Sequence, residues 1–156
     1  MLALGIPRPQ EESSEKKLLR EWGPTILAVL VIYLMLNVVL PVVLSTKSPL
    51  MVVVSESMVP TLNVGDIIIV QGRDSYEIED IVVYVTSLYQ KPIVHRIIDT
   101  KNNGNFVTKG DNNSFPDPGT IAPREGVSLD DVQGKVVYVI PKLGFPKYLL
   151  SELFSG

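Results

Sequence analysis

The stretch Met51 to Asp66, MVVVSESMVPTLNVGD, decides how the rest of the chain is interpreted. Residues 51–54 predict a buried strand, because a short apolar run bounded by turn residues is typical of one. This strand leads directly into Ser-Glu-Ser at residues 55–57, and Pro60 stiffens the turn that follows. The sequence therefore places two hydroxyl groups at the end of a rigid element. A polar turn that merely closes the strand is the alternative.

The composition of the 156 residues favours one domain and one apolar segment. Hydrophobic residues make up 46% of the chain, the mean hydropathy is +0.24, and the apolar excess lies near the N-terminus. A net charge of −3 gives no reason to expect a basic surface, so no nucleic-acid partner is predicted. The chain has no cysteine, which excludes disulfides, thiolate metal sites and a cysteine nucleophile. We expect no cofactor and no metal.

The segment from Thr25 to Ser45 contains no charged residue. At 1.5 Å per residue its roughly 21 positions reach about 31 Å, enough to cross a hydrocarbon core of about 30 Å. The run is longer than the core of a signal peptide, and no small-x-small cleavage site ends it. We therefore predict an uncleaved transmembrane helix over residues 24–46, kinked at Pro41, instead of a buried helix or a cleaved signal peptide.

Basic residues flank this helix unequally. Four precede it and one follows closely: Arg8, Lys16, Lys17, Arg20 and Lys47. Because positive charge is retained on the cytoplasmic side, residues 1–23 are predicted to form a cytoplasmic tail and residues 47–156 an extracytoplasmic domain. The expected location is the cell membrane, or the endoplasmic-reticulum membrane in a eukaryote, with a single membrane pass.

The chain after the anchor is rich in β-branched residues. Apolar runs separated by turn residues fall at 50–54, 66–70, 80–86, 93–98, 105–108 and 135–140. They predict a mainly β fold, a single antiparallel β domain over residues 47–156. Apolar residues at helical spacing after Gly144 predict a short C-terminal amphipathic helix, which lies on the membrane surface or packs against the β domain.

A serine nucleophile needs a base within hydrogen-bond reach. His95 is the only histidine of the chain and the first candidate, because only an imidazole has an unperturbed pKa near neutrality. A half-buried histidine on a strand is the structural alternative. Lys91 and Lys109 are rival bases, and either would have to be desolvated to act as one.

Three motifs, in this order along the chain, resemble those of type I signal peptidases, the membrane proteases that remove signal peptides from exported proteins. They are residues 55–61 (SESMVPT), 94–97 (VHRI) and 108–113 (TKGDNN). Bacterial members of that family have a lysine base on the corresponding strand, whereas archaeal and endoplasmic-reticulum members have histidine followed by arginine. The resemblance is therefore to the second branch, and it implies a signal-peptidase-like β fold with an N-terminal membrane anchor.

The resemblance also implies functions for individual residues. Ser57 is the expected nucleophile, His95 the general base and Asp117 the acid that orients the imidazole. Asp111 is the competing acid, because Asp117 has a proline on each side and its loop is stiff. If Asp117 pairs with the histidine, Asp111 is expected to support the site by hydrogen bonding or charge.

The oxyanion of the reaction and the substrate also need partners. The backbone N–H of Ser57 is the first expected oxyanion donor, and by resemblance the Ser55 hydroxyl is the second, although Glu56 stands where glycine is frequent. An edge strand can bind an extended peptide by strand addition, with pockets lined by residues 50–54 and 82–85. The resemblance implies small residues, typically alanine, at the two enzyme-facing positions before the cut.

The expected partners are signal peptides emerging from the translocon, the lipid bilayer and additional membrane subunits. Two other functions compete with peptide hydrolysis by a serine-histidine-aspartate site. One is a membrane-tethered β module that binds peptides without cutting them. The other is a self-cleaving repressor-type protease, which would need a lysine base and a DNA-binding segment in place of the anchor.

Overall fold

A computed structural model describes residues 14–144 of the chain, which forms two compact units, Met1–Val39 and Leu40–Gly156. The first unit contains an apolar helix, α1 (Ser14–Leu34), and a π-helical turn (Met35–Val39). The second begins with the helical turn α2 (Leu40–Val43) and contains the β domain. The amphipathic helix predicted after Gly144 lies outside the described residues.

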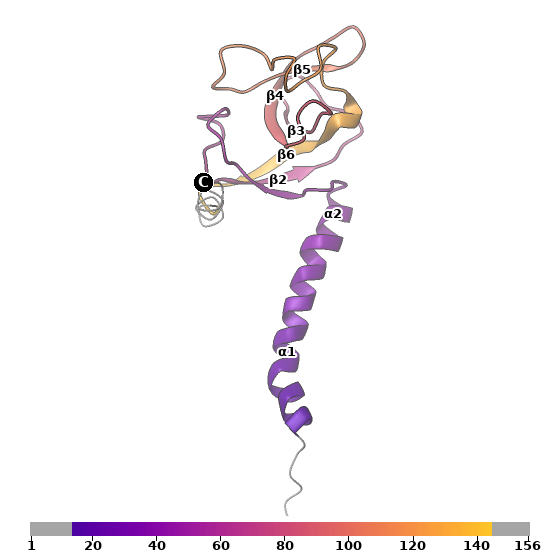
Figure 1. Ribbon diagram of the computed structural model, residues 1–156, viewed down its shortest axis with the longest axis vertical. Coiled ribbons are helices and arrows are strands. Elements are labelled where there is room, and N and C mark those ends of the chain that lie inside the picture. The colour runs from indigo at the N-terminus through magenta and orange to yellow at the C-terminus, as the bar shows by residue number, and fades with distance from the viewer. Residues whose placement is uncertain (1–13, 145–156) are drawn as a thin grey trace, which may run out of the picture. The chain divides into compact units, whose positions relative to one another are not determined.

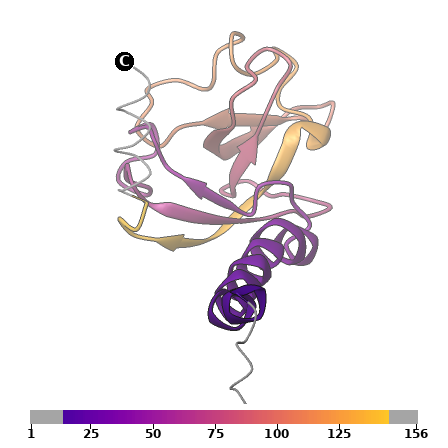
Figure 2. The same cartoon turned by 60° about the horizontal axis from the view of Figure 1, so that its bottom comes forward.

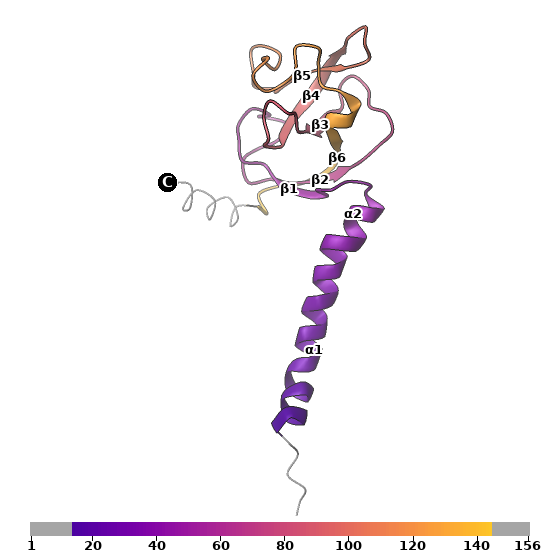
Figure 3. The same ribbon diagram turned by 45° about the vertical axis from the view of Figure 1, so that its right-hand side comes forward.

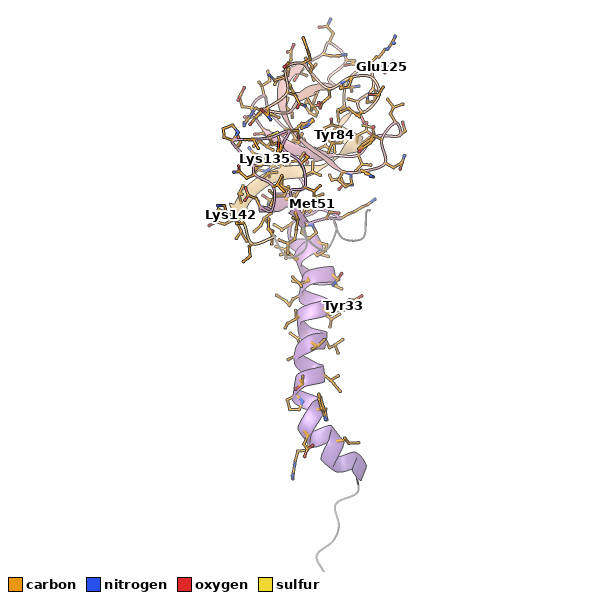
Figure 4. All side chains as sticks on the ribbon, turned by 60° about the vertical axis from the view of Figure 1, so that its left-hand side comes forward. Tyr33, Met51, Tyr84, Glu125, Lys135 and Lys142 are labelled. Atoms are coloured by element: carbon orange, nitrogen blue, oxygen red, sulfur yellow. The ribbon has the colours of Figure 1, made fainter. Side chains whose placement is uncertain are left out.

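The helical stretch Arg20–Val43 is long and apolar enough to cross a membrane. It has 24 residues, and its most apolar 18 residues have a mean hydropathy of 2.8 and are not buried by any described part of the chain. Tyr33, for example, projects from the helix with 59% of its surface exposed (Figure 4). A helix that is apolar on all sides and covered by no other part of the described chain is typical of a membrane span.

The π-helical turn (Met35–Val39) lies immediately before Pro41, where the sequence predicts a kink. Proline has no N–H to donate, and its ring clashes with the carbonyl of the residue four positions earlier, which is Asn37. A wider turn relieves that clash. The Asn37 side-chain amide donates to the Tyr33 carbonyl over 3.0 Å, so it is satisfied within the helix.

Six strands form one antiparallel sheet in the order β1-β2-β6-β3-β4-β5 (Figure 1). The strands are β1 (Leu50–Val52), β2 (Ile67–Gln71), β3 (Ile81–Tyr84), β4 (Ile93–Thr100), β5 (Phe106–Lys109) and β6 (Val132–Ile140), and a 3₁₀ turn (Leu129–Asp131) precedes β6. The predicted antiparallel β domain is confirmed. β6 begins three residues earlier than the sequence suggests, because Val132 and Gly134 pair with β3.

The long strand β6 joins the two halves of the sheet. Its first residues pair with β3 and its later residues with β2, with bulges at Val83/Tyr84 and Ile69/Val70. Figures 2 and 3 show β6 bending from the neighbourhood of β3 to that of β2, so that the sheet curls over. Bulges increase local twist and bending, which accounts for the curvature.

The central position of β3 divides the core into two clusters. Val82 and Tyr84 point into one cluster and Val83 into the other, as the alternation of a strand requires. All three side chains are completely buried, and Figure 4 shows Tyr84 inside the domain. The second cluster also contains Met58 and Leu62, which follow the Ser-Glu-Ser segment. The core therefore fixes the chain on which the candidate nucleophile lies.

Candidate active site

Ser57 lies on a turn that the core holds from one side. The next residue, Met58, is 1% exposed, and the Leu62 N–H donates to its carbonyl over 2.9 Å. Before the turn, the Val53 N–H donates to the Asp66 carbonyl, also over 2.9 Å. Ser57 is thus tied to buried residues before and after it, while its own side chain reaches the surface of a cavity.

His95 lies on β4 with its ring buried and bridges a serine and an aspartate. Its Nε2 is 3.1 Å from the Ser57 Oγ, and its Nδ1 is 2.7 Å from the Asp117 Oδ2. The side chains of His95 and Asp117 are only 6% and 1% exposed. With a proton on Nδ1, the imidazole would donate to Asp117 and leave Nε2 to accept from the serine hydroxyl.

Two hydroxyl groups for which the sequence predicts no contact with the acid hold Asp117. The Tyr84 hydroxyl donates to its Oδ2 over 2.6 Å, and the Thr108 Oγ1 donates to the same oxygen over 2.7 Å. The Asp117 N–H in turn donates to the Thr108 carbonyl over 2.8 Å. Burial, and then the hydrogen bond to Asp117, raise the pKa of Tyr84 far above its ordinary range, so the phenol stays a donor.

Asp111, the competing acid, has other partners. Arg96 donates to it twice, from Nε to Oδ1 over 2.8 Å and from Nη2 to Oδ2 over 2.6 Å. The Thr61 hydroxyl donates to Oδ2 over 2.6 Å. These hydrogen bonds, that of Arg96 foremost, lower the pKa of Asp111. Asp111 therefore connects the strand that bears His95 to the segment that follows the serine.

The loop at residues 110–113 packs directly on the backbone of the serine turn. The Asn112 N–H donates to the Ser57 carbonyl over 2.8 Å, and the Asn112 side-chain amide donates to the Glu56 carbonyl over 3.2 Å. A Cβ on Gly110 would lie 2.6 Å from the Ser57 carbonyl oxygen, so only glycine permits this approach. Asn112 belongs to the third motif, but the spacing of that motif alone does not reveal this contact.

The predicted oxyanion donors lie beside the serine oxygen. The Ser55 Oγ is 3.2 Å from the Ser57 Oγ, and no hydrogen bond within residues 14–144 uses the Ser57 N–H. The oxyanion role of these two groups stays a prediction. Glu56 is exposed, so its carboxylate has access to solvent.

A cavity of about 520 Å³ opens beside Ser57 and His95. Its apolar walls come from residues 51–54 of the first strand region and residues 92–94 at the start of β4. The prediction for residues 50–54 agrees with this cavity, except that Leu50 does not line it. The prediction for residues 82–84 is wrong, because β3 lies between two strands and buries these side chains completely, and Val85 does not line this cavity either.

The two candidate lysine bases differ in position. Lys91 lines the same cavity as Ser57, whereas Lys109 lies on β5 opposite Arg96. The described hydrogen bonds of the Ser57 hydroxyl go to His95 and Ser55.

A hydroxyl, an imidazole and a buried carboxylate joined in this order are the arrangement found in serine-type peptidases. Comparison with known proteins narrows this class. The model of the Peptidase S24-like family matches residues 3–137. The signal peptidase complex catalytic subunit SEC11 of Scheffersomyces stipitis is 36% identical over 119 residues, and that of Komagataella phaffii is 38% identical over 125 residues. Each match covers 72% of this chain and 72% of the relative.

The SEC11 protein of Debaryomyces hansenii is 34% identical over 120 residues, with the same coverage of both chains. The chain therefore belongs to the Peptidase S24-like family and, within it, to the signal peptidases of the endoplasmic-reticulum type. The resemblance inferred from the three motifs is confirmed.

Proposed function

We propose that this protein cleaves N-terminal signal peptides from exported preproteins, as a membrane-bound serine endopeptidase. The observation that supports this most directly is the continuous hydrogen-bonded chain from the Ser57 Oγ through His95 to Asp117. The relatives are named as catalytic subunits of a signal peptidase complex, which supports the same activity and the presence of further membrane subunits.

In the proposed mechanism, His95 Nε2 takes the proton of the Ser57 hydroxyl as the oxygen attacks the carbonyl carbon before the cut. Asp117 holds the imidazole and stabilises the imidazolium that forms. His95 then gives the proton to the leaving amine, and the acyl group remains on Ser57. A water molecule, activated by the same imidazole, releases the acyl group and restores the serine.

The backbone N–H of Ser57 and the Ser55 hydroxyl are proposed to bind the oxyanion. The position of the Ser55 hydroxyl, 3.2 Å from the Ser57 Oγ, supports its part in this proposal. Removing one oxyanion donor typically costs ~2.7–4 kcal/mol of transition-state stabilisation. Asp111 is proposed to act at a distance, by keeping Arg96 and Thr61 in place on either side of the site.

The substrate is proposed to bind as an added strand along the edge strand β1, with small side chains in the apolar cavity. β1 is the outermost strand of the sheet, so one of its edges is unpaired within the described chain. Strand addition uses such an edge and places alternate side chains in pockets. The apolar walls of residues 51–54 and 92–94 suit small apolar side chains near the cut.

The apolar helix is proposed to anchor the protein with the N-terminus in the cytoplasm and the β domain outside. This keeps the site beside substrates that are themselves tethered to the membrane and raises their effective concentration. The chain has no cysteine, so single cysteines introduced by Ser13→Cys and Ser87→Cys can be labelled in intact cells or microsomes. In intact cells only the Ser87→Cys site should react with a membrane-impermeant maleimide. In sealed microsomes, whose cytoplasmic face points outward, only the Ser13→Cys site should react, and the opposite pattern would reverse the proposed orientation.

The activity is tested with the detergent-solubilised full chain and a preprotein that carries a signal peptide. The unaltered enzyme should release mature protein, whereas Ser57→Ala and His95→Ala should lose at least about 10⁴-fold of the rate. Ser87→Ala, an exposed serine, is the matched control and should keep full activity. Cleavage by either site variant at the unaltered rate would refute the assignment.

Lys91 provides the test of the serine-lysine alternative, because it lines the cavity that holds Ser57. If His95 is the base, Lys91→Ala should change the rate by only a few-fold. Loss of cleavage in Lys91→Ala, together with retained cleavage in His95→Ala, would favour a lysine base. Peptide binding without any product from the unaltered enzyme would favour the non-cutting module.

A further inference from the structure

A second, mainly polar pocket lies where the chain leaves α2 and meets the β domain. It has a volume of about 270 Å³ and belongs entirely to the second unit. Its polar lining comes from three parts of the chain, with Ser45 after α2, Arg73, Asp74 and Tyr76 after β2, and Gln133 on β6. None of these residues contacts Ser57, His95 or Asp117 through a described hydrogen bond, so the pocket is separate from the candidate active site.

Backbone contacts fix the walls of this pocket. The Gly72 N–H donates to the Leu44 carbonyl over 2.8 Å, and the Thr46 hydroxyl donates to the Gln133 carbonyl over 2.8 Å. A Cβ on Gly72 would lie 2.0 Å from the Ser45 carbonyl oxygen, so the two segments meet at a distance that only glycine allows. The segment after α2 is therefore locked to β2 and β6, and the pocket is preformed.

The lining offers partners for both a negative and a positive group. Arg73 supplies a guanidinium, and the Tyr76 hydroxyl accepts from the Arg73 N–H over 3.1 Å, which leaves its own hydrogen free to donate. Asp74 supplies a carboxylate. The Gln133 Oε1 is buried and has no hydrogen-bond partner among the described residues. A buried acceptor without a donor costs about 1–3 kcal/mol, so the amide would gain by turning toward the pocket to accept from a ligand donor.

The position of Ser45 along the chain limits how far this wall of the pocket can lie from the hydrocarbon core of the membrane. The apolar stretch ends at Val43, and Ser45 is two residues further on, at most about 7 Å away along the chain. The polar layer on each side of the hydrocarbon core is roughly 5–8 Å thick. If Arg20–Val43 spans the bilayer, the Ser45 wall of the pocket lies within reach of the lipid headgroups.

We propose that this pocket binds the headgroup of a zwitterionic phospholipid, with the phosphate at Arg73 and Tyr76 and the ammonium at Asp74 and the Gln133 Oε1. A single cationic side chain beside a carboxylate does not favour a polyanionic headgroup. This inference depends on the membrane anchoring proposed above, but not on the peptidase activity. Bound lipid would fix how the β domain is held against the membrane.

The test uses the full chain with Ser57→Ala, so that no activity enters the readout. The protein is exchanged into nanodiscs of phosphatidylglycerol with a small fraction of phosphatidylethanolamine, then released and examined by native mass spectrometry. One phosphatidylethanolamine should stay bound, and Arg73→Gln should weaken its retention at least tenfold. Arg124→Gln, which removes a cation from a different pocket, is the matched control and should retain the lipid.

Three outcomes would overturn the proposal. Equal retention by Arg73→Gln would remove the pocket as the lipid site. Competition by free phosphoethanolamine as strong as that by the lipid would assign the pocket to a soluble phosphate compound instead. Failure of the protein to enter nanodiscs would refute the membrane anchoring and the lipid site together, whereas the soluble cleavage assay would still report on the peptidase.

Discussion

The hydrogen-bonded series Ser57–His95–Asp117 has a nucleophile end at Ser57 and an acid end at Asp117, and the protein holds these two ends in different ways. At the acid end, Asp117 is 1% exposed and receives hydrogen bonds from Tyr84 and Thr108, both of which lie on strands of the sheet. At the nucleophile end, Ser57 lies on a turn between the exposed Glu56 and the buried Met58, and Asn112 donates to its carbonyl. A nucleophile must remain accessible to the substrate, so Ser57 is held through its backbone and its side chain is left free to face the cavity.

The acid end can therefore be rigid, because nothing has to reach it except the imidazole. Its partners are hydroxyl groups of the core, which remain in place as long as the sheet is folded. The nucleophile end depends on Met58 in the core, on the loop at residues 110–113 and on the ion pair of Asp111 with Arg96. The comparison predicts large losses where the hydrogen-bonded chain itself is cut and smaller ones where only its supports are removed.

Asp117→Asn should have the largest effect, because it replaces the carboxylate that faces His95 by an amide of nearly the same size. An amide at this position favours the wrong tautomer of His95, and kcat should fall by about 10⁴-fold. The measurement is the rate of preprotein cleavage. Asp130→Asn, an exposed aspartate, is the control. A loss of less than about tenfold would show that the imidazole does not need Asp117.

Ser55→Ala tests the nucleophile end. If the Ser55 hydroxyl donates to the oxyanion, its removal should lower kcat about 10²-fold and leave KM nearly unchanged, because the donor acts only in the transition state. Ser87→Ala is again the control. A rise in KM of similar size, with kcat unchanged, would show instead that Ser55 contacts the bound substrate.

Asp111→Asn removes the support of the nucleophile end. An amide keeps only one acceptor oxygen, so the negative charge and one of the two hydrogen bonds from Arg96 are lost, which should lower the free energy of unfolding by roughly 1.5–3 kcal/mol. The measurement is thermal unfolding followed by circular dichroism, with Asp130→Asn as the control. Unfolding at the same temperature as the unaltered chain would show that the ion pair does not hold the loop.

The lowered pKa of Asp111 predicts that its contribution to the stability of the fold depends on pH. Because Arg96 lowers the pKa of Asp111 in the folded state below its ordinary value of 3.8, the carboxylate stabilises the fold fully above that value. The stabilisation is lost as the pH falls below 3.8 and through the lowered pKa. The difference in stability between the unaltered chain and Asp111→Asn should thus be constant from pH 7 to about 5 and shrink at more acidic pH.

The sequence predicts the nucleophile end better than the acid end. Ser57 and His95 stand in local motifs, and the antiparallel β domain follows from β-branched runs between turn residues. In the sequence, Tyr84 and Thr108 look like ordinary residues of buried strands. Their contact with Asp117 forms only when the chain folds, so no local pattern predicts it. The pairing of β6 with both β2 and β3 is likewise non-local, and no short pattern contains it.

Tyr84→Phe should have the smallest effect and is the sharpest test of the comparison. It removes one of three donors to the Asp117 Oδ2 and leaves Thr108 and His95 in place, so kcat should fall only about fivefold, or about 1 kcal/mol. KM should not change, because Tyr84 is buried away from the cavity. Tyr138→Phe, a tyrosine that is 63% exposed, should behave as the unaltered enzyme does. A loss as large as that of Asp117→Asn would mean that the core hydroxyls orient the acid instead of merely supporting it, and that the acid end is the less rigid of the two.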